Sequence, residues 1–397
     1  DIATGATGRN HGLLHSGARY AVNDQESAEE CIKENKILRN IARHCVDETE
    51  GLFITLPEDS LDYQKTFIES CTKSGIEAVA IDPKLAQIME PSVNPNLVGA
   101  VVVPDGSIDP FRLTASNVMD ATENGAKMFT YCEVKSLIRE GGKVIGVDVY
   151  DHKNRVNRKF FAPLVVNAGG IWGQGIAEYA DLKIKMFPAK GALLVMGHRI
   201  NKMVINRCRK PADADILVPG DTICVIGTTS SRIPYDQIDN MEVTPEEVDI
   251  LFRAYAGVRP LVASDDDPSG RNVSRGIVLL DHAERDGLDG FITITGGKLM
   301  TYRLMAEWAT DLVCKKLNKT ARCTTAERPL PGSSESRAET NQKVISLPST
   351  IRYSAVYRHG SRATRLLDKE RLDRSMVCEC EAVTAGEVRY AVDELNV

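Results

Sequence analysis

The sequence has 397 residues, of which 43% are hydrophobic and 26% charged, and its 49 basic and 55 acidic side chains give a net charge of −6. This length is typical of two or three globular domains, and the acidic balance argues against a nucleic-acid-binding protein. No apolar run reaches the roughly 18–20 residues of a membrane-spanning helix, so we expect any membrane contact to be peripheral and made through a partner.

The first third of the chain combines glycine-rich loop with helices. Residues 1–20 are rich in Gly, Thr, His and Ser, which predicts loop or a helix start. Apolar periodicity and turn residues predict helices over about 27–45 and 63–74, a strand over 97–103 and a helix from 110 to 125. Asp109-Pro110 supplies the start signal of that last helix, with Asp as the cap and Pro in the first turn.

The middle of the chain predicts mainly strands. We expect them at 128–131, 134–140, 144–151 and 160–167, with several more between 184 and 233. Gly141-Gly142 predicts a hairpin between the second and the third of these strands. The apolar strand 160–167 runs into Gly169-Gly170 and a helix, which is typical of a doubly wound nucleotide-binding sheet.

The last third predicts helices, two strands and a linker. Thr244 and Glu247 have the spacing of a capping box, which predicts a helix to about residue 255. Strands are expected at 273–280 and 291–295, and a helix from 297 to about 317. Residues 318–349 are polar and contain prolines, as in a linker, and a short helical region follows.

Two short basic segments are the most informative features. Residues 257–260 read Gly-Val-Arg-Pro, and residues 295–303 place Lys298 and Arg303 after two glycines. Glycine lets the backbone approach a ligand closely, and arginine can hold a phosphate through two parallel hydrogen bonds. In an acidic chain, these cations predict an anionic, phosphorylated small substrate. The alternative is that they are exposed cations beside ordinary turns.

Four segments in this order resemble the FAD-dependent glycerol-3-phosphate dehydrogenases, in particular the catalytic A subunits of the bacterial anaerobic enzymes. They are residues 17–20, 167–172, 257–260 and 296–303, and the resemblance extends over nearly the whole chain. It implies an α/β fold like that of the glycine and D-amino-acid oxidases: a doubly wound FAD-binding domain, an antiparallel-sheet substrate cap domain and a small helical C-terminal region. The implied reaction is oxidation of sn-glycerol 3-phosphate to dihydroxyacetone phosphate, with hydride passed to FAD.

The resemblance also implies domain boundaries. We expect the FAD-binding domain to comprise 1–75, 98–180 and 271–318, and the cap domain to comprise 76–97 and 181–270. A linker over 319–350 is expected to lead into the helical C-terminal region, 351–397, which includes the start of a ferredoxin-like cysteine module.

Two family features have no counterpart in this sequence. The family opens with a strand, a GxGxxG turn and a second strand ending in an acid that binds the FAD ribose, and nothing of this kind precedes Asp1. We therefore expect a longer protein, in which the FAD pyrophosphate contacts lie elsewhere. Some relatives carry a histidine shortly after a Lys-Gly pair of the cap domain. Here Lys190-Gly191 is followed by Ala192, so the proton-accepting base is not assigned.

The chemistry and the resemblance together predict which residues form the active site. Oxidation of a secondary alcohol needs a hydride acceptor, a base for the hydroxyl proton and cations for the phosphate. By family match, Arg259 and Lys298 are first choices for substrate contact and catalysis, and Arg19 and Arg275 are second choices for the phosphate. His15 is a candidate base, although structural histidines are more frequent. The residues expected to bind the cofactor are Gly169, Gly170, Gly296, Gly297, Lys298 and Thr301.

The cysteines suggest a second cofactor. Eight of the ten are scattered singly, as in a reducing compartment, whereas Cys378 and Cys380 form a Cys-x-Cys pair. In the relatives such a pair opens an iron–sulfur module, and a cluster usually takes four thiolates, so we expect half of a site here. The alternative is two ordinary reduced cysteines. The resemblance further implies flavin/iron–sulfur and membrane-anchor subunits, electron transfer to quinone, and a cytoplasmic location on the inner face of the membrane.

Two other functions remain open. An FAD-dependent amine or amino-acid oxidase of the same fold needs one arginine for the substrate carboxylate, which leaves the other cations unexplained. A non-catalytic sugar-phosphate-binding module explains the cations without any turnover.

Overall fold

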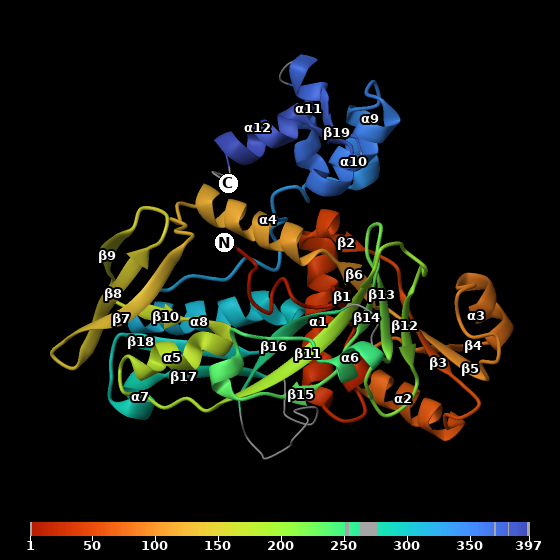
Figure 1. Ribbon diagram of the computed structural model, residues 1–397, viewed down its shortest axis with the longest axis horizontal. Coiled ribbons are helices and arrows are strands. Elements are labelled where there is room, and N and C mark those ends of the chain that lie inside the picture. Colours follow the sequence, from red (N-terminus) through yellow and green to blue (C-terminus); the bar gives the residue numbers. More distant parts are fainter. Residues whose placement is uncertain (1, 251–253, 263–275, 369–370, 380, 395–397) are drawn as a thin grey trace.

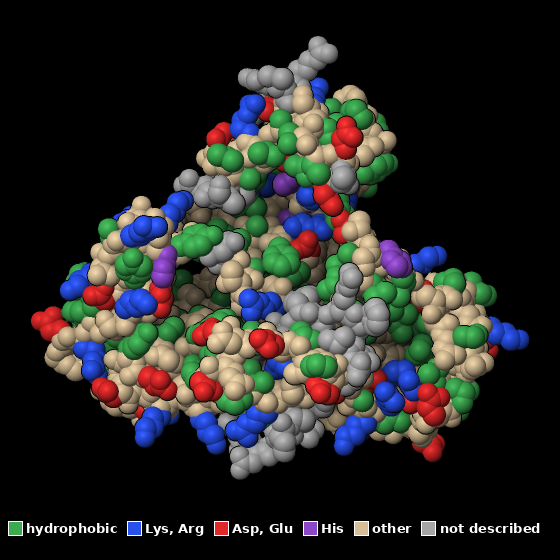
Figure 2. All heavy atoms as spheres, viewed as in Figure 1, with side chains coloured by type: hydrophobic (Ala, Val, Ile, Leu, Met, Phe, Trp, Pro, Cys, Tyr) green, Lys and Arg blue, Asp and Glu red, His purple; other side chains and the backbone are tan. Residues whose placement is uncertain are grey.

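The computed structural model describes residues 2–250, 254–262, 276–368, 371–379 and 381–394. Two sheet-bearing regions lie side by side, and the helices at the end of the chain form a smaller third region beside them (Figure 1). Figure 2 shows that the molecule is hollowed between this third region and the rest of the chain. The fold is α/β, as expected.

The larger region is a nine-stranded sheet in which most neighbouring strands are antiparallel. Its strands are β3 (Gly51–Thr55), β4 (Val79–Ile81), β5 (Gly99–Val103), β11 (Met186–Met196), β12 (Val204–Arg207), β13 (Ile216–Pro219), β14 (Cys224–Gly227), β15 (Ser231–Arg232) and β16 (Ala254–Val262). Their order is β15-β11-β14-β13-β12-β3-β5-β4, and β16 pairs with β11. Among these described strands, only β12 and β3 pair in parallel. The sheet has the antiparallel character expected of the cap.

Two strands of this sheet come from segments that the sequence analysis assigned to the FAD-binding domain. β5 pairs with β3 and β4, and β3 pairs with β12. Helices α2 (Leu61–Lys73) and α3 (Pro83–Met89) accompany them, and Phe67 of α2 packs on Phe53 of β3 with ring centres 4.6 Å apart. The expected boundaries at residues 75 and 98 do not follow the sheet pairing, because an apolar strand carries no local signal for the sheet it joins.

The second region contains two three-stranded sheets and several helices. The sheets are β1 (Leu13–Leu14), β6 (Gly106–Ile108) and β2 (Val46–Asp47), and β10 (Val165–Asn167), β18 (Phe291–Gly296) and β17 (Ile277–Asp281). The helices are α1 (Gln25–Ile41), α4 (Pro110–Glu123), α5 (Gly173–Glu178), α7 (His282–Asp286) and α8 (Tyr302–Lys316). β10 and β18 pair in parallel, as a doubly wound sheet requires.

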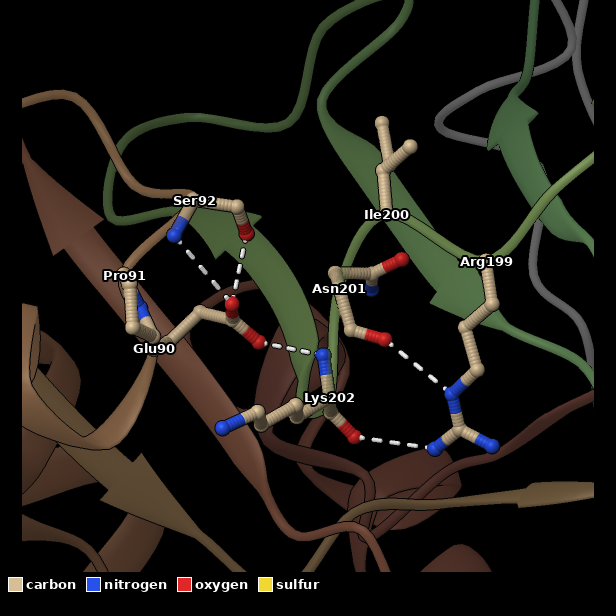
Figure 3. Close-up of a pocket in the computed structure, with 7 residues that line it drawn as sticks. All are labelled: Glu90, Pro91, Ser92, Arg199, Ile200, Asn201 and Lys202. Carbon is tan, nitrogen blue, oxygen red and sulfur yellow. Dashed lines mark hydrogen bonds between the residues drawn. The ribbon is translucent and has the colours of Figure 1, made fainter.

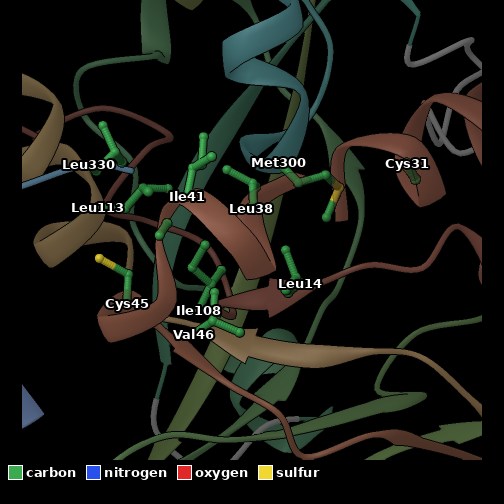
Figure 4. Close-up of a cluster of buried hydrophobic side chains, with 11 residues drawn as sticks. Leu14, Cys31, Leu38, Ile41, Cys45, Val46, Ile108, Leu113, Met300 and Leu330 are labelled. Carbon is green, nitrogen blue, oxygen red and sulfur yellow. The ribbon is translucent and has the colours of Figure 1, made fainter. Parts of the chain in front are cut away.

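The core of this second region joins segments that are far apart in the sequence (Figure 4). Leu38 and Ile41 of α1 pack with Leu113 of α4, and Met300, just before α8, completes the contact. Asp109 caps α4 as predicted: one oxygen of its carboxylate accepts the N–H groups of Phe111 and Arg112, both at 2.9 Å.

The strands β7 (Cys132–Glu140), β8 (Lys143–Asp151) and β9 (Val156–Phe161) form a separate meander, and Gly141-Gly142 makes the predicted hairpin. The strand predicted at 128–131 is not formed. Phe129 in that segment instead stacks on Phe160, with ring centres 4.8 Å apart. The single strand predicted at 160–167 is divided between β9 and β10. Pro163 lies in the gap, and proline has no N–H to donate to a ladder.

The cap contains one further short helix, α6 (Pro245–Ile250). The predicted capping box is present, since Thr244 N donates to Glu247 Oε2 at 3.0 Å and Glu247 N donates to Thr244 Oγ1 at 3.3 Å. The helix does not reach residue 255 as predicted, because β16 begins at Ala254 and pairs along β11. Sheet pairing thus overrides the local helical pattern there.

The C-terminal region consists of α9 (Arg337–Lys343), α10 (Ser349–His359), α11 (Ala363–Asp368), α12 (Ala385–Asp393) and the pair β19 (Met376–Cys378) and β20 (Val383–Thr384). It is helical, as predicted, but α9 already lies within the expected linker. Thr384 opens α12 with a capping box, because Thr384 N donates to Glu387 Oε2 at 2.7 Å and Glu387 N donates to Thr384 Oγ1 at 3.3 Å.

Buried polar contacts attach the C-terminal region to the second region. His44 hydrogen-bonds Ser333 through Nδ1 at 2.7 Å and Ser116 of α4 through Nε2 at 3.0 Å. The guanidinium of Arg112 donates to Tyr357 O at 2.6 Å and lies 4.0 Å from the centre of the Tyr357 ring. Burial, and then the positive charge of Arg112, lowers the pKa of His44 to about 3. Neutral His44 is therefore part of this interface.

Candidate active site

A cavity of about 1190 Å³ lies between the second region and the nine-stranded sheet. Its walls come from the loop before β1, the helices α4 and α8, the ends of β10 and β18, and strand β11 of the cap. Among the described residues that line it are four cations and a single carboxylate, namely Arg9, Arg19, Lys210, Lys298 and Asp24. In a chain of net charge −6, this excess of positive charge favours an anionic ligand.

One wall of the cavity is the turn that follows β10. Asn167, at the end of the strand, donates from Nδ2 to Gly173 O at 2.9 Å and accepts from Gly169 N at 3.1 Å. These bonds hold the turn in shape, and Gly169 and Gly170 both line the cavity. The structure thus places these two predicted cofactor residues where a ligand can approach their backbone.

A second glycine turn, after β18, faces the same cavity. Gly296, Gly297 and Lys298 all line it. Gly297 has a φ of 65°, and a Cβ at this position would stand 2.6 Å from Met305 Sδ, so the turn requires glycine. Thr301 is different from its neighbours. It is buried, does not line the cavity, and accepts from Lys298 N at 2.9 Å, so it holds the turn instead of facing the cofactor as predicted.

Lys298 is placed as a charged ligand contact. Its Nζ is buried without a hydrogen-bond partner among the residues the structure describes, and it lies 4.5 Å from the centre of the Tyr20 ring. Near it, burial raises the pKa of the Cys31 thiol to about 11, although the ammonium of Lys298 acts in the opposite direction. The thiol and the aromatic ring are neutral. The charge of Lys298 also acts on the Glu30 carboxyl, whose pKa is raised mainly by burial, but the two side chains form no ion pair, so the ammonium is available to an anion in the cavity.

His15 also lines the cavity and packs on Tyr20, the ring that Lys298 contacts. Its ring centre is 5.3 Å from that of Tyr20 and 5.7 Å from that of His11, and its side chain is buried. Asn35 of α1 holds its loop, since Nδ2 donates to Leu14 O and His15 O, both at 3.2 Å. The structure therefore brings His15, Tyr20 and Lys298 together, as the base hypothesis requires.

Arg19 lines the cavity but is already engaged with the cap. Its guanidinium donates to Ala212 O at 3.2 Å and to Asn206 Oδ1 at 3.4 Å, and it lies 3.8 Å from the buried Asp215 carboxylate. To contact a phosphate directly, as predicted, Arg19 would have to give up these bonds, which join the two regions.

Three predicted residues are only partly covered by the structure. Arg259 belongs to β16, where its backbone pairs with Ala189 of β11, two residues before the cavity-lining Gly191. Its side chain, and the whole of Arg275 and Cys380, lie outside the described residues. Cys378 is a free cysteine in β19. The substrate contacts of Arg259 and Arg275 and the iron–sulfur role of Cys378 and Cys380 stay predictions.

Two other polar groups have structural partners. Arg303 leaves the cavity and forms a buried ion pair with Glu34, with Nη2–Oε1 at 2.5 Å and Nε–Oε2 at 2.9 Å. His282, next to Asp281 in the sequence, contacts Asp286 at 2.6 Å and Thr293 at 2.8 Å. Asp281 caps α7, because the one-turn separation of residues 282 and 286 favours that pair.

A second, smaller hollow of about 460 Å³ lies between the ends of α3 and β11 (Figure 3). Glu90 at its edge is satisfied by the protein, since its carboxylate accepts from Lys202 N at 2.5 Å, Met203 N at 2.8 Å and Ser92 Oγ at 2.5 Å. None of the predicted site residues lines this hollow.

Comparison with known proteins decides the family. The profile described as FAD dependent oxidoreductase matches residues 1–303. The chain belongs to this family of FAD-dependent oxidoreductases. Within it, the chain is 91% identical to the A subunit of the anaerobic glycerol-3-phosphate dehydrogenase of Haemophilus influenzae, over the whole chain and 73% of that protein. It is 68% identical to the A subunit of the Escherichia coli enzyme of the same name, again over the whole chain and 76% of that protein.

Solved structures agree with this family assignment at the level of the fold. A glycerol-3-phosphate dehydrogenase of Bacillus halodurans, complexed with FAD, aligns with the whole chain and 77% of its own length, at 23% identity and a TM-score of 0.70. A glycine oxidase of Bacillus cereus aligns over 81% of this chain and 90% of its own, at 19% identity and a TM-score of 0.60. The predicted glycine-oxidase-like fold is thereby confirmed.

The cavity of this flavoprotein fits FAD. Its volume of about 1190 Å³ exceeds the roughly 300–1,000 Å³ typical of ligand pockets, so an extended cofactor has room. Two glycine turns at strand ends allow backbone contact, and the ammonium of Lys298 is buried with no carboxylate in ion-pair contact among the described residues. Gly169, Gly170, Gly296, Gly297 and Lys298 would hold the cofactor.

Two further observations bear on the other predictions. Within the described residues, none of the helices has the length and apolarity to cross a membrane. The same residues contain no group of three or more His, Cys, Asp or Glu side chains arranged to hold a metal ion.

Proposed function

We propose that this chain carries the active site of an anaerobic glycerol-3-phosphate dehydrogenase, which oxidises sn-glycerol 3-phosphate to dihydroxyacetone phosphate. The observation that carries the proposal is the 91% identity, over the whole chain, to a protein of that name. The excess of cations around the cavity supports a phosphorylated substrate. An amine or amino-acid substrate would leave that excess unexplained.

The protein residues divide the work of such a reaction between them. Bound FAD supplies the acceptor for the hydride that leaves the substrate carbon. Lys298, together with Arg259 and Arg275, holds the substrate anion, and His15 accepts the hydroxyl proton on a ring nitrogen. Thr301 and Asn35 keep Lys298 and His15 in place through the hydrogen bonds described above. The buried cavity wall excludes water from the reacting atoms.

We also propose that the electrons leave through partner subunits toward quinone. Both relatives are named as one subunit of a larger enzyme, which supports the existence of partners. The pair Cys378 and Cys380 supports an iron–sulfur carrier completed outside these residues. Such a complex would sit on the cytoplasmic face of the membrane, attached through a membrane-anchor protein.

The test is anaerobic reduction of the full-length protein. The yellow flavin absorbance should bleach with glycerol 3-phosphate and should persist with glycerol, which lacks the phosphate, and with glycine, the probe for amine oxidation. Absence of bleaching by glycerol 3-phosphate would sink the proposal, and bleaching by glycine would favour the amine oxidase. With the partner subunits present, a quinone analogue should restore the colour; reoxidation at the same rate without them would remove the partner proposal.

A further inference from the structure

A basic run spans the end of β12 and the connection to β13, and its members Arg207, Arg209 and Lys210 differ in their partners. Arg207 Nη2 lies 2.7 Å from Asp59 Oδ2, and Arg209 Nη2 lies 2.7 Å from Asp215 Oδ1. Lys210 is exposed, lines the cavity and has no carboxylate or hydrogen-bond partner among the described residues. Of these three side chains, only Lys210 has no carboxylate partner among the described residues, and it faces the cavity.

Asp215 keeps this connection in a fixed shape. Its side chain is buried, and in addition to Arg209 it accepts from Ala212 N at 2.7 Å. Arg19 reaches across from the other side of the cavity and donates to Ala212 O at 3.2 Å. Pro211, next to Lys210, restricts the backbone further. Lys210 thus extends from a rigid base, and only its own side chain is free to follow a ligand.

We propose that Lys210 is a phosphate-recognition residue of the substrate site, and that Arg19 is a positioning residue which holds the connection that presents Lys210. The inference rests on the proposed function, because it takes glycerol 3-phosphate as the substrate. A lysine ammonium that forms no ion pair in the protein can bind a phosphate dianion without first breaking such a pair, so little free energy is lost on binding. The arginines of the same run would first have to leave their carboxylates, which is why they are not assigned this role.

The charge balance of the cavity supports this assignment. Lys210 contributes one of the four cations that line the described cavity, against a single carboxylate. It comes from the cap, whereas Lys298 comes from the turn after β18 in the second region, so both regions contribute positive charge to the cavity. An exposed cation at a cavity also attracts its ligand over about a Debye length, an effect that added salt screens.

The test compares Lys210→Gln with the wild type in the full-length, FAD-loaded protein. With an artificial electron acceptor, the KM for glycerol 3-phosphate should rise about tenfold or more, while kcat stays within about twofold, as expected for an interaction made equally with substrate and transition state. Calorimetric binding of dihydroxyacetone phosphate should weaken by a similar factor. The rise of KM with ionic strength should flatten, and Lys210→Arg should keep most of the wild-type affinity.

Two controls keep the result interpretable. Lys202→Gln removes another exposed lysine, which lines the separate hollow of Figure 3, and should leave KM and binding unchanged. As a single variant, Arg19→Gln should raise KM. In the Lys210→Gln background it should raise KM little further, because Arg19 acts through Lys210. Unchanged KM and binding in Lys210→Gln, with the wild type still bleached by glycerol 3-phosphate, would overturn this inference only. A wild type that is not bleached would overturn the proposed function and this inference together.

Discussion

The cavity wall and the interface between α1 and α8 each bury a cation from the same short segment, and they treat it in opposite ways. At the interface, Arg303 forms two hydrogen bonds with the buried carboxylate of Glu34. In the cavity wall, five residues earlier, the ammonium of Lys298 is buried and has no hydrogen-bond partner in the described chain. A paired buried charge belongs to the fold, whereas an unpaired one beside a cavity is available to a ligand. Sequence proximity alone cannot separate the two roles.

The largest effect on stability should come from breaking the pair at the interface. Arg303→Met leaves Glu34 as an uncompensated buried charge, so the free energy of unfolding should fall by about 3–5 kcal/mol. Urea denaturation followed by circular dichroism measures the change. The double variant Arg303→Met/Glu34→Leu should recover most of the loss, since it replaces the pair with apolar side chains. An Arg303→Met protein as stable as the wild type would show that the pair does not hold the fold.

The next largest effect should be on the reaction and not on the fold. Lys298→Met removes a buried ammonium that has no protein partner in the described residues, so the free energy of unfolding should stay equal or rise. The rate of flavin reduction by glycerol 3-phosphate should fall by about 10²–10³-fold, or about 2.7–4 kcal/mol of activation free energy. Anaerobic stopped-flow absorbance measures that rate. Normal flavin reduction together with a large loss of stability in Lys298→Met would show that Lys298, like Arg303, serves the fold and not the ligand.

The smallest effect per step of the experiment, taken per pH unit, concerns a buried group that stays neutral. The pKa of His44 falls to about 3 in the folded protein, from an ordinary value of 6.5, so the unfolded chain binds the extra proton between those values. Stability should therefore decrease as pH falls from about 6.5 toward 3, by up to about 1.4 kcal/mol per pH unit from this group. His44→Gln keeps a hydrogen-bonding side chain without the titration.

The measurement for His44 is urea denaturation at a series of pH values. The slope of the unfolding free energy against pH should be shallower for His44→Gln than for the wild type between pH 4 and 6. Identical slopes would mean that the proton is taken up elsewhere. His152→Gln is the matched control, because His152 lies on the exposed meander and pairs with Glu133 at 2.8 Å.

Much of the fold was predictable wherever the signal is local. The caps of Asp109 and Thr244 and the hairpin at Gly141-Gly142 form as the sequence predicts, because each depends on residues within a few positions. Predictions that depend on distant pairing were less accurate. The strand at 160–167 is divided around Pro163, the helix predicted to residue 255 gives way to β16, and β5 joins the cap sheet.

The candidate site was predictable to a similar extent. The two glycine turns of the family segments line one cavity, and so does His15; the roles assigned to them stay predictions. Thr301 turned out to bond its own turn, and Arg19 to bond the cap. Lys210 was missed, although the basic run at residues 207–210 was a visible signal, because its neighbours carry the same charge and only their carboxylate partners distinguish them.

By itself, the sequence determined the family and the local turns, since the order of its glycine and cation motifs is specific and each turn is set by neighbouring residues. Only the tertiary structure decided which cations are neutralised. Arg303 and Glu34 are 269 positions apart, and Arg19 lies 193 positions from Ala212. Whether a charge is neutralised inside the protein or left for a ligand depends on contacts of that range, which no local pattern encodes.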